Sequence, residues 1–188
     1  MNIPFIDLKA QYGRLKPEID AGIERVLEHG RFILGPEVGE FEAALAAHVG
    51  VAHVVSCANG TDALTLALMG ENIGPGDAVF IPGFTFTATA ETVLMVGAEP
   101  VFVDVDGENF LIDHADLERK IAAVKAAGSL TPRAVIPVDL FGLPADYEAL
   151  AKISEAHDLF LLADAAQSMG AQYRGRAVGA LAPATVSS

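Results

Sequence analysis

Short apolar runs alternate with helical segments along most of this 188-residue chain, and this alternation restricts the fold more than any other feature. The runs are bounded by Gly, Pro, Asp and Ser, and they are too short to be helices. We predict strands at 52–56, 78–81, 100–103, 134–138 and 159–163. The helices predicted between them lie at 61–69, 87–96, 116–127 and 146–157. Strands that alternate with helices form parallel sheets through right-handed crossovers, so we expect an α/β fold with three layers, α/β/α, and a mostly parallel, doubly wound sheet.

Two helical segments precede this alternation. The first is predicted at 14–29, and the second at 36–48 with Pro36 in its first turn. One face of the first helix carries its apolar residues, which are Leu15, Ile19, Ile23, Val26 and Leu27. We therefore divide the chain into an N-terminal helical segment, 1–50, and a sheet-forming domain, 51–188.

The last part of the sequence predicts a turn followed by the beginning of a strand. Residues 173–179 have the composition of a turn or small hairpin, and we expect Arg174 and Arg176 to lie on its surface. The alternative for these two arginines is contact with an acidic or nucleotide substrate. Residues 184–188 begin an apolar strand at which the sequence stops. Domains rarely end on such a strand, so we expect the chain to be a fragment.

Charge and hydropathy indicate which partners this protein can bind and in which compartment we expect it. The formal net charge is −13 at pH 7, which disfavours nucleic acid because phosphate binding requires a basic face. No apolar run approaches the roughly 18 residues that a membrane span requires. Met1–Lys9 lacks the basic and apolar regions of a signal peptide. We therefore expect a cytoplasmic protein with neither a nucleic-acid nor a membrane partner.

Cysteine and histidine usage gives no sign of a disulfide or a metal site. Cys57 is the one cysteine, so an intrachain disulfide is impossible, and we expect Cys57 to be a small buried side chain. The five histidines show no metal-ligand spacing, and we predict no metal site.

A carboxylate directly follows the fifth predicted strand, 159–163. Asp164 follows the apolar run 160–163, and Gln167 stands three residues later. Ligands of open α/β sheets bind outside the carboxyl ends of the strands, so Asp164 is placed to meet a cationic heterocycle. The alternative is that Asp164 caps the segment that follows it.

The turn after the first predicted strand is suited to a phosphate. In the run Ser56–Asp62, Gly60 and Thr61 stand at the start of a helix, where free main-chain N–H groups and the helix dipole favour an anion. The run is neither a Walker loop nor a Gly-x-Gly-x-x-Gly motif. The alternative is an ordinary helix cap made by Asn59 or Thr61.

Aromatic residues leave the second predicted strand, in the run Pro82–Thr89. Phe84 or Phe86 could stack on a planar cofactor there, and the alternative for each is core packing. A phosphate cradle, a stacking ring and an anion are the contacts that pyridoxal 5′-phosphate requires. A lysine that would bind this cofactor covalently does not follow the fifth predicted strand. The lysines of the chain are Lys9, Lys16, Lys120, Lys125 and Lys152.

Seven ordered segments resemble the N-terminal half of the DegT/StrS-type sugar aminotransferases, which use pyridoxal 5′-phosphate and have the aspartate aminotransferase fold, fold type I. The resemblance covers essentially the whole chain. The segments are 5–9, 33–38, 56–64, 74–77, 82–91, 100–104 and 164–168.

The resemblance implies a role for six residues of this chain. Gly60 and Thr61 match the phosphate-binding turn, and Phe86 matches the aromatic residue that stacks on the pyridine ring. Asp164 matches the partner of the ring nitrogen, and Gln167 matches the residue that hydrogen-bonds the phenolic oxygen. Ser187, or Ser188 beside it, matches a serine that also holds the phosphate.

The resemblance places the covalent, Schiff-base lysine just after Ser188, so that the chain itself contains no catalytic residue. On this basis 51–188 is a partial large domain, and a small C-terminal domain is absent.

The resemblance also implies a reaction for the intact protein. An amino group passes from glutamate to a keto group of a nucleotide-linked sugar, with a UDP-3-keto-hexuronate as the candidate substrate, for amino-sugar or cell-surface polysaccharide biosynthesis. Intact members are homodimers with sites between subunits, and we expect the isolated fragment to be inactive. Two alternatives stay open: a sugar 3-dehydratase of the same family, with histidine in place of lysine, and a non-catalytic α/β ligand-binding module.

Overall fold

A computed structural model describes residues 5–188 of the chain. The stretch Met1–Lys9, from which we expected no signal peptide, lies partly outside the described residues. The chain divides between Leu45 and Ala46 into two compact units. Within the described range, no helix is both long and apolar enough to cross a membrane.

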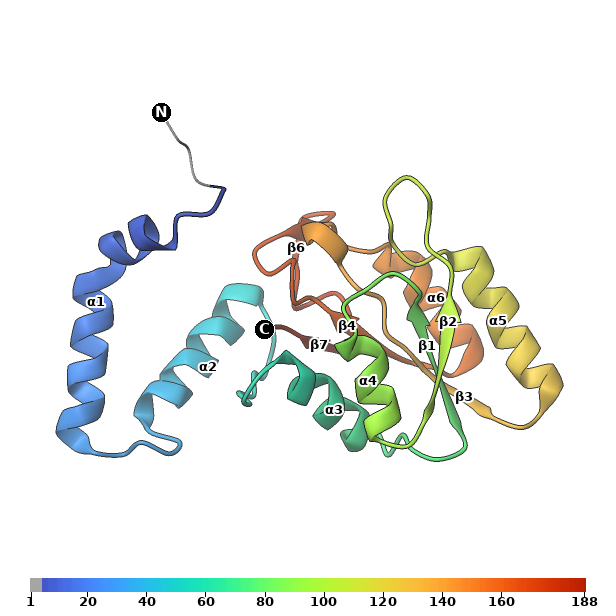
Figure 1. Cartoon of the computed structure of the whole chain (residues 1–188), viewed down its shortest axis with the longest axis horizontal. Helices are drawn as coiled ribbons and strands as arrows, with labels where there is room; N and C mark the ends of the chain where they lie inside the picture. Colours follow the sequence, from blue (N-terminus) through green and yellow to red (C-terminus); the bar gives the residue numbers. More distant parts are fainter. Residues whose placement is uncertain (1–4) are drawn as a thin grey trace. The chain divides into compact units, whose positions relative to one another are not determined.

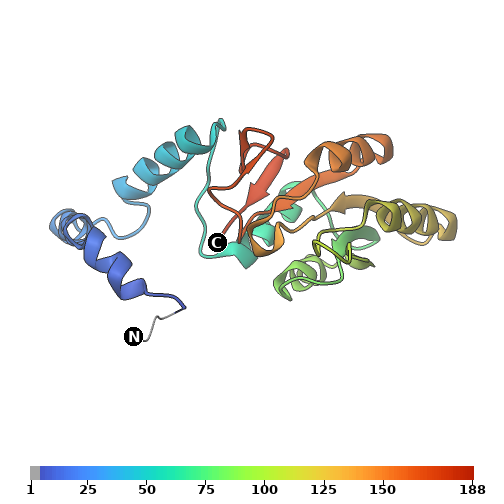
Figure 2. The same ribbon diagram turned by 90° about the horizontal axis from the view of Figure 1, so that it is seen from above.

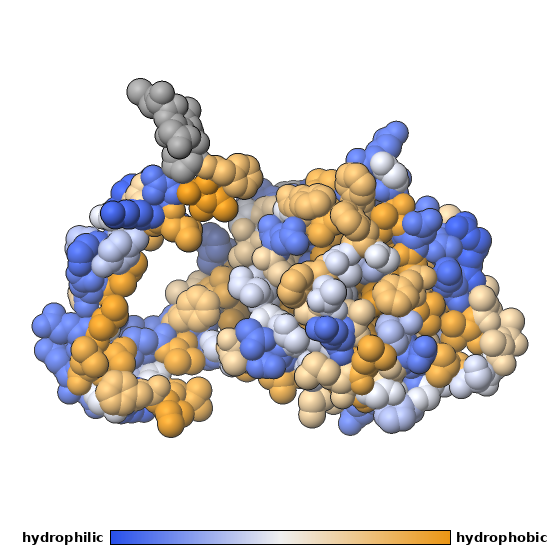
Figure 3. Space-filling view, viewed as in Figure 1, coloured by the Kyte–Doolittle hydropathy of each residue, from blue (hydrophilic) through white to orange (hydrophobic). Residues whose placement is uncertain are grey.

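The N-terminal part of the chain is helical, as predicted. Helix α1 (Leu8–His29) begins earlier than residue 14 because the Asp7 carboxylate caps it, accepting a hydrogen bond of 2.9 Å from the Ala10 N–H. It ends at Gly30, whose φ of 66° is the left-handed conformation that glycine adopts most readily. Helix α2 covers Pro36–Val49. None of the described residues of α1 is buried, and its apolar stripe is visible in orange in Figure 3.

The rest of the chain is built on a five-stranded sheet with the order β2-β1-β3-β4-β7. All four pairings are parallel, which confirms the predicted α/β class (Figure 1). The strands are β1 (Asp77–Pro82), β2 (Glu99–Val103), β3 (Thr131–Val135), β4 (Phe160–Asp164) and β7 (Ala184–Val186).

Helices cover both faces of this sheet, and the side chains of the inner strand β1 alternate between two hydrophobic clusters beneath them. On β1, Val79 and Ile81 belong to one cluster, together with residues of α3 (Gly60–Gly70) and α4 (Ala88–Met95). Phe80, between them, belongs to the other cluster, together with residues of α5 (His114–Ala127) and α6 (Tyr147–His157). The period of two along the strand therefore produces the three layers. Figure 2 shows α4 and α6 on opposite sides of the sheet.

Two sequence predictions in the segment before α3 are wrong. Residues 52–56 are not a strand: no described residue pairs with them in a sheet, and Val55 is 84% exposed. Apolar β-branched residues make a strand only when a neighbouring strand supplies hydrogen-bond partners. Cys57 is exposed rather than buried, and its thiol donates to the Asn59 carbonyl at 3.3 Å within the turn that begins α3.

The hairpin and the strand predicted for the last part of the sequence are confirmed. Strands β5 (Gln172–Tyr173) and β6 (Arg176–Ala177) form an antiparallel hairpin, and the apolar run after it is β7. Arg174, at the turn of the hairpin, pairs with Glu148 at the surface. Arg176 donates to the Ala180 carbonyl.

Candidate functional site

A cavity of about 230 Å³ lies at the carboxyl ends of β4 and β7, beside the start of α3. All six residues that the sequence singled out line it, although they come from four separate parts of the chain. They are Gly60, Thr61, Phe86, Asp164, Gln167 and Ser187, with Ser188 beside them. The parallel topology brings Phe86, Asp164, Gln167 and Ser187 together, because the ends of β1, β4 and β7 and the loops after them meet at one edge of the sheet. Gly60 and Thr61 join them from the start of α3.

Asp164 is the buried charge of this cavity, with 6% of its surface exposed. Its Oδ2 accepts a hydrogen bond from the Thr89 hydroxyl at 3.2 Å, and its Oδ1 accepts one from the Ala166 N–H at 3.2 Å. Thr89 is in turn bonded to the Thr85 hydroxyl at 3.0 Å. No helix follows Asp164, so it is not a helix cap, although the bond to Ala166 shows that it does close the turn after β4.

Burial raises the pKa of Asp164, and the negative charge of nearby Asp139 raises it further. No lysine, arginine or histidine within residues 5–188 forms an ion pair with Asp164. A desolvated carboxylate without a counter-charge is stabilised by a cation, so the cavity is suited to a positively charged group.

Asn59 caps the N-terminus of α3, as the alternative interpretation of this turn predicted. Its side-chain oxygen accepts from the Asp62 N–H at 2.9 Å, and its amide donates to the Asp62 carboxylate at 3.1 Å. The other main-chain N–H groups in the first turn of α3 have no intrahelical partner, and they include those of Gly60 and Thr61. A Cβ atom on Gly60 would stand 2.9 Å from Cβ of Ser188. The absence of a side chain at Gly60 therefore keeps this corner of the cavity open.

The core-packing alternative for the two phenylalanines is wrong, because Phe86 is 71% exposed and Phe84 is 50% exposed. Phe84 belongs to a cluster of three rings with Phe110 and Phe141, whose centroids are 5.7–6.4 Å apart. Phe110 and Phe141 were not predicted from the sequence. Both have positive φ, 64° and 57°, and the one local signal was Gly142 after Phe141.

The Gln167 side chain is oriented by the loop that follows β3. Its Oε1 accepts a hydrogen bond of 2.7 Å from the Phe141 N–H. The two N–H groups of Nε2 therefore remain for an acceptor in the cavity that Gln167 lines. Ser187 also lines the cavity, and its hydroxyl donates to the Ala165 carbonyl at 3.3 Å.

No lysine is among the described residues that line the cavity. Lys120 and Lys125 lie on α5, Lys152 lies on α6, and Lys9 and Lys16 lie on α1. The described residues also include no group of three or more His, Cys, Asp and Glu side chains that could hold a metal ion.

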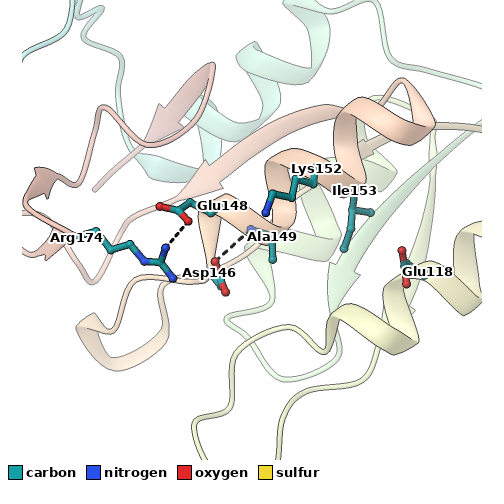
Figure 4. A pocket seen from close by; sticks show the side chains of 7 residues that line it. All are labelled: Glu118, Asp146, Glu148, Ala149, Lys152, Ile153 and Arg174. Carbon is teal, nitrogen blue, oxygen red and sulfur yellow. Dashed lines mark hydrogen bonds and ion pairs between the residues drawn. The ribbon is translucent and has the colours of Figure 1, made fainter.

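A second, more open hollow of about 480 Å³ lies where α6 begins (Figure 4). Three of its charged side chains, Asp146, Glu148 and Arg174, make local structural contacts. Arg174 pairs with Glu148, and Asp146 caps α6 by accepting from the Ala149 N–H at 3.1 Å. Asp146 also accepts from the Tyr173 hydroxyl at 2.6 Å, which lowers the pKa of this carboxyl. These contacts stabilise the junction of helix and hairpin.

We expect Asp164→Asn to stabilise the ligand-free chain progressively as the pH rises. A carboxyl group whose folded pKa is raised contributes stability that is full below its ordinary value of 3.8 and is lost as the pH rises through the folded value. Each pKa unit corresponds to about 1.4 kcal/mol. Urea unfolding of both proteins between pH 4 and pH 8 should show a difference that grows with pH. Asp158→Asn, the same substitution at an exposed position, is the matched control. Parallel curves for the wild type and Asp164→Asn would contradict the expectation.

The sequence of this chain is similar to those of known aminotransferases. The model of the DegT/DnrJ/EryC1/StrS aminotransferase family matches residues 14–188. The UDP-2-acetamido-2-deoxy-3-oxo-D-glucuronate aminotransferase of Pseudomonas aeruginosa is 50% identical over 176 residues, which are 93% of this chain and 46% of that protein. The chain spans about half the length of the curated relatives it matches.

Solved structures share the fold. A DegT/DnrJ/EryC1/StrS aminotransferase from Brucella abortus is 52% identical, with a TM-score of 0.92 over 95% of this chain and 48% of that one. NtdA from Bacillus subtilis, solved with bound cofactor PMP, is 28% identical, with a TM-score of 0.81 over 93% of this chain and 39% of that one.

Proposed function

This chain belongs to the DegT/DnrJ/EryC1/StrS aminotransferase family, and from that membership we propose that residues 51–188 are part of the pyridoxal 5′-phosphate-binding large domain of a sugar aminotransferase. The whole protein transfers the amino group of glutamate to a keto group of a nucleotide-linked sugar. The relative from Pseudomonas aeruginosa that is 50% identical to this chain is named for a UDP-linked 3-oxo-glucuronate. A UDP-3-keto-hexuronate is therefore the first substrate to test. We also propose a cytoplasmic homodimer.

The observation that carries this proposal is the buried carboxylate of Asp164, which lacks a cationic partner among the described residues and shares a cavity with the start of α3. The donor set fits the two ends of the cofactor. One end of the cavity has an anionic side chain for a protonated ring nitrogen, and the other has free N–H groups for a phosphate.

We propose a role for each of the residues that the sequence singled out. The N–H groups of Gly60 and Thr61, with the hydroxyl of Ser187 or Ser188, bind the phosphate. Phe86 offers a ring face to the pyridine, and Asp164 holds a proton on its nitrogen. Gln167 donates from Nε2 to the phenolic oxygen. When bound, the cofactor supplies an electron sink for the transfer of the amino group. Because no lysine among the described residues lines the cavity, we propose that the covalent lysine comes from outside this 188-residue chain.

We test this proposal with pyridoxamine 5′-phosphate, which needs no lysine to bind. Isothermal titration calorimetry should show binding to the wild-type chain, and Gly60→Val should weaken that binding about tenfold or more, equivalent to about 1.4 kcal/mol. The added side chain crowds Ser188, since even a Cβ atom would stand 2.9 Å from it. The matched control is Gly70→Val at the other end of α3, where a Cβ atom meets nothing within 4 Å.

A second comparison isolates the phosphate end. Pyridoxamine without its phosphate should bind the wild type and Gly60→Val equally weakly. No binding of the phosphorylated ligand to the wild type would refute the cofactor assignment. Glutamate-dependent turnover by the 188 residues alone would refute the assignment of the lysine to other residues.

A further inference from the structure

Asp139 is a second buried carboxylate close to Asp164, and the sequence analysis did not single it out. It is 0% exposed and is not among the residues that line the cavity. Its main-chain N–H donates to the Asp164 carbonyl at 3.0 Å, and the Asp164 N–H donates to the Pro137 carbonyl at 3.0 Å. These two bonds continue the parallel pairing of β3 and β4 and hold the two acidic residues on adjacent chain segments.

The carboxylate of Asp139 joins the loop after β3 to the turn after β4. Its Oδ1 accepts from the Ala145 N–H at 2.9 Å and from the Tyr147 hydroxyl at 2.7 Å. Its Oδ2 accepts from the Ser168 hydroxyl at 2.6 Å. The loop closed in this way contains Phe141, whose N–H holds the Gln167 carboxamide. Asp139 therefore controls, through one loop, which group of Gln167 remains for a ligand.

The charge of Asp139 also acts on the cavity. The groups that face it are Tyr147 from α6, Asp164 from β4 and Ser168 from the turn, and none of them is basic. Burial raises the pKa of Tyr147, and the charges of Asp139 and Asp164 raise it further, so the phenol stays a donor. Burial raises the pKa of Asp139 as well, while its three hydrogen bonds oppose that effect. Two carboxylates thus share one desolvated region, and no cationic side chain of the described residues pairs with either.

Resting on the proposed function, we propose that Asp139 is a positioning residue for the pyridine ring: its charge, next to Asp164, favours the protonated ring nitrogen, and its hydrogen bonds fix the loop that orients Gln167. The two effects are separable. Asp139→Asn removes the charge, and its amide can still accept from Ala145 and Tyr147 and donate to Ser168. Ser168→Ala keeps the charge and removes one tie between loop and turn.

The test is a pH titration of pyridoxamine 5′-phosphate, labelled with ¹⁵N at the ring nitrogen and bound to the protein, followed by the ¹⁵N chemical shift. We expect Asp139→Asn to lower the pH at which the bound ring nitrogen loses its proton by about one unit, the effect of removing a nearby charge. Ser168→Ala should leave this midpoint unchanged and weaken binding severalfold. Asp158→Asn, the same change of charge at an exposed position at the end of α6, should alter neither.

The outcomes separate this inference from the function on which it rests. An unchanged midpoint in Asp139→Asn, with binding intact, overturns the role of its charge and leaves the cofactor assignment standing. Unchanged affinity in Ser168→Ala overturns the role of the loop tie. Failure of the wild type to bind the ligand overturns both the proposed function and this inference. If Asp139→Asn does not fold, Tyr147→Phe is measured beside Ser168→Ala, since each removes one hydrogen bond to Asp139 and keeps its charge. Wild-type affinity in both variants would overturn the loop tie, and a lowered midpoint in both would overturn the assignment of the midpoint to the charge.

Discussion

Asp164→Asn is expected to lower glutamate-dependent transamination by the whole protein about 10²–10³-fold, the range found when one preorganised electrostatic contact is removed from an active site. An amide has no negative charge with which to hold a proton on the ring nitrogen, and the cofactor is a weaker electron sink without that proton. The loss should appear in kcat more than in KM for the sugar, because the substitution acts on the cofactor rather than on the substrate. Steady-state assay of glutamate consumption measures both.

The control for this variant is Asp158→Asn, which changes net charge equally and lies at an exposed position. It should retain full activity. Retained activity in Asp164→Asn would mean that another group protonates the cofactor. Because the same variant is expected to be more stable without ligand at neutral pH, a loss of activity could not be attributed to unfolding. The two predictions together place function and stability in opposition at Asp164, as is common for buried charges at active sites.

Phe80→Ala is expected to destabilise the chain by about 3–5 kcal/mol. Phe80 lies on β1, between β2 and β3, and is 0% exposed within the cluster beneath α5 and α6. Its removal leaves a cavity that close-packed neighbours cannot fill. Urea unfolding, with the midpoint and slope fitted separately, measures the change.

The matched control for Phe80 is Phe102→Ala on the adjacent strand β2, where the ring is 53% exposed. This substitution should cost less than about 1 kcal/mol, because surface replacements leave no cavity. Equal losses in the two variants would show that the cluster beneath α5 and α6 is not close-packed.

Local patterns predicted most of the fold. The helices from α2 to α6 and the strands β1, β2, β4 and β7 lie within a few residues of their predicted positions, because the apolar period distinguishes helix from strand locally. The strand predicted at 134–138 lies earlier, at Thr131–Val135, and the strand predicted at 52–56 is absent. Both errors concern pairing: whether an extended apolar segment becomes a strand depends on its neighbours, which are remote in sequence.

Some residues of the candidate site could likewise be predicted from local sequence, and others could not. Asp164, Gly60 and Phe86 were identifiable because each stands in a loop after an apolar run or at the start of a helix, where parallel α/β sheets collect their ligands. Phe110 and Phe141 gave no comparable signal, because what unites them is the ring contact with Phe84 across three loops. Asp139 stands between apolar residues, Val138 and Leu140, and its bond to Ser168 spans 29 positions.

Local sequence alone specifies the alternation of elements, the parallel class of the sheet and the residue types that a phosphate and a cationic ring would meet. These depend on periodicity and on turn chemistry, which act over a few residues. Tertiary packing was needed to establish that six of those residues line one cavity, that Asn59 caps α3, and that two buried carboxylates, Asp139 and Asp164, lie on adjacent segments without a cationic partner among the described residues. These depend on the register of β3 against β4 and on burial, which arise only when distant segments pack together.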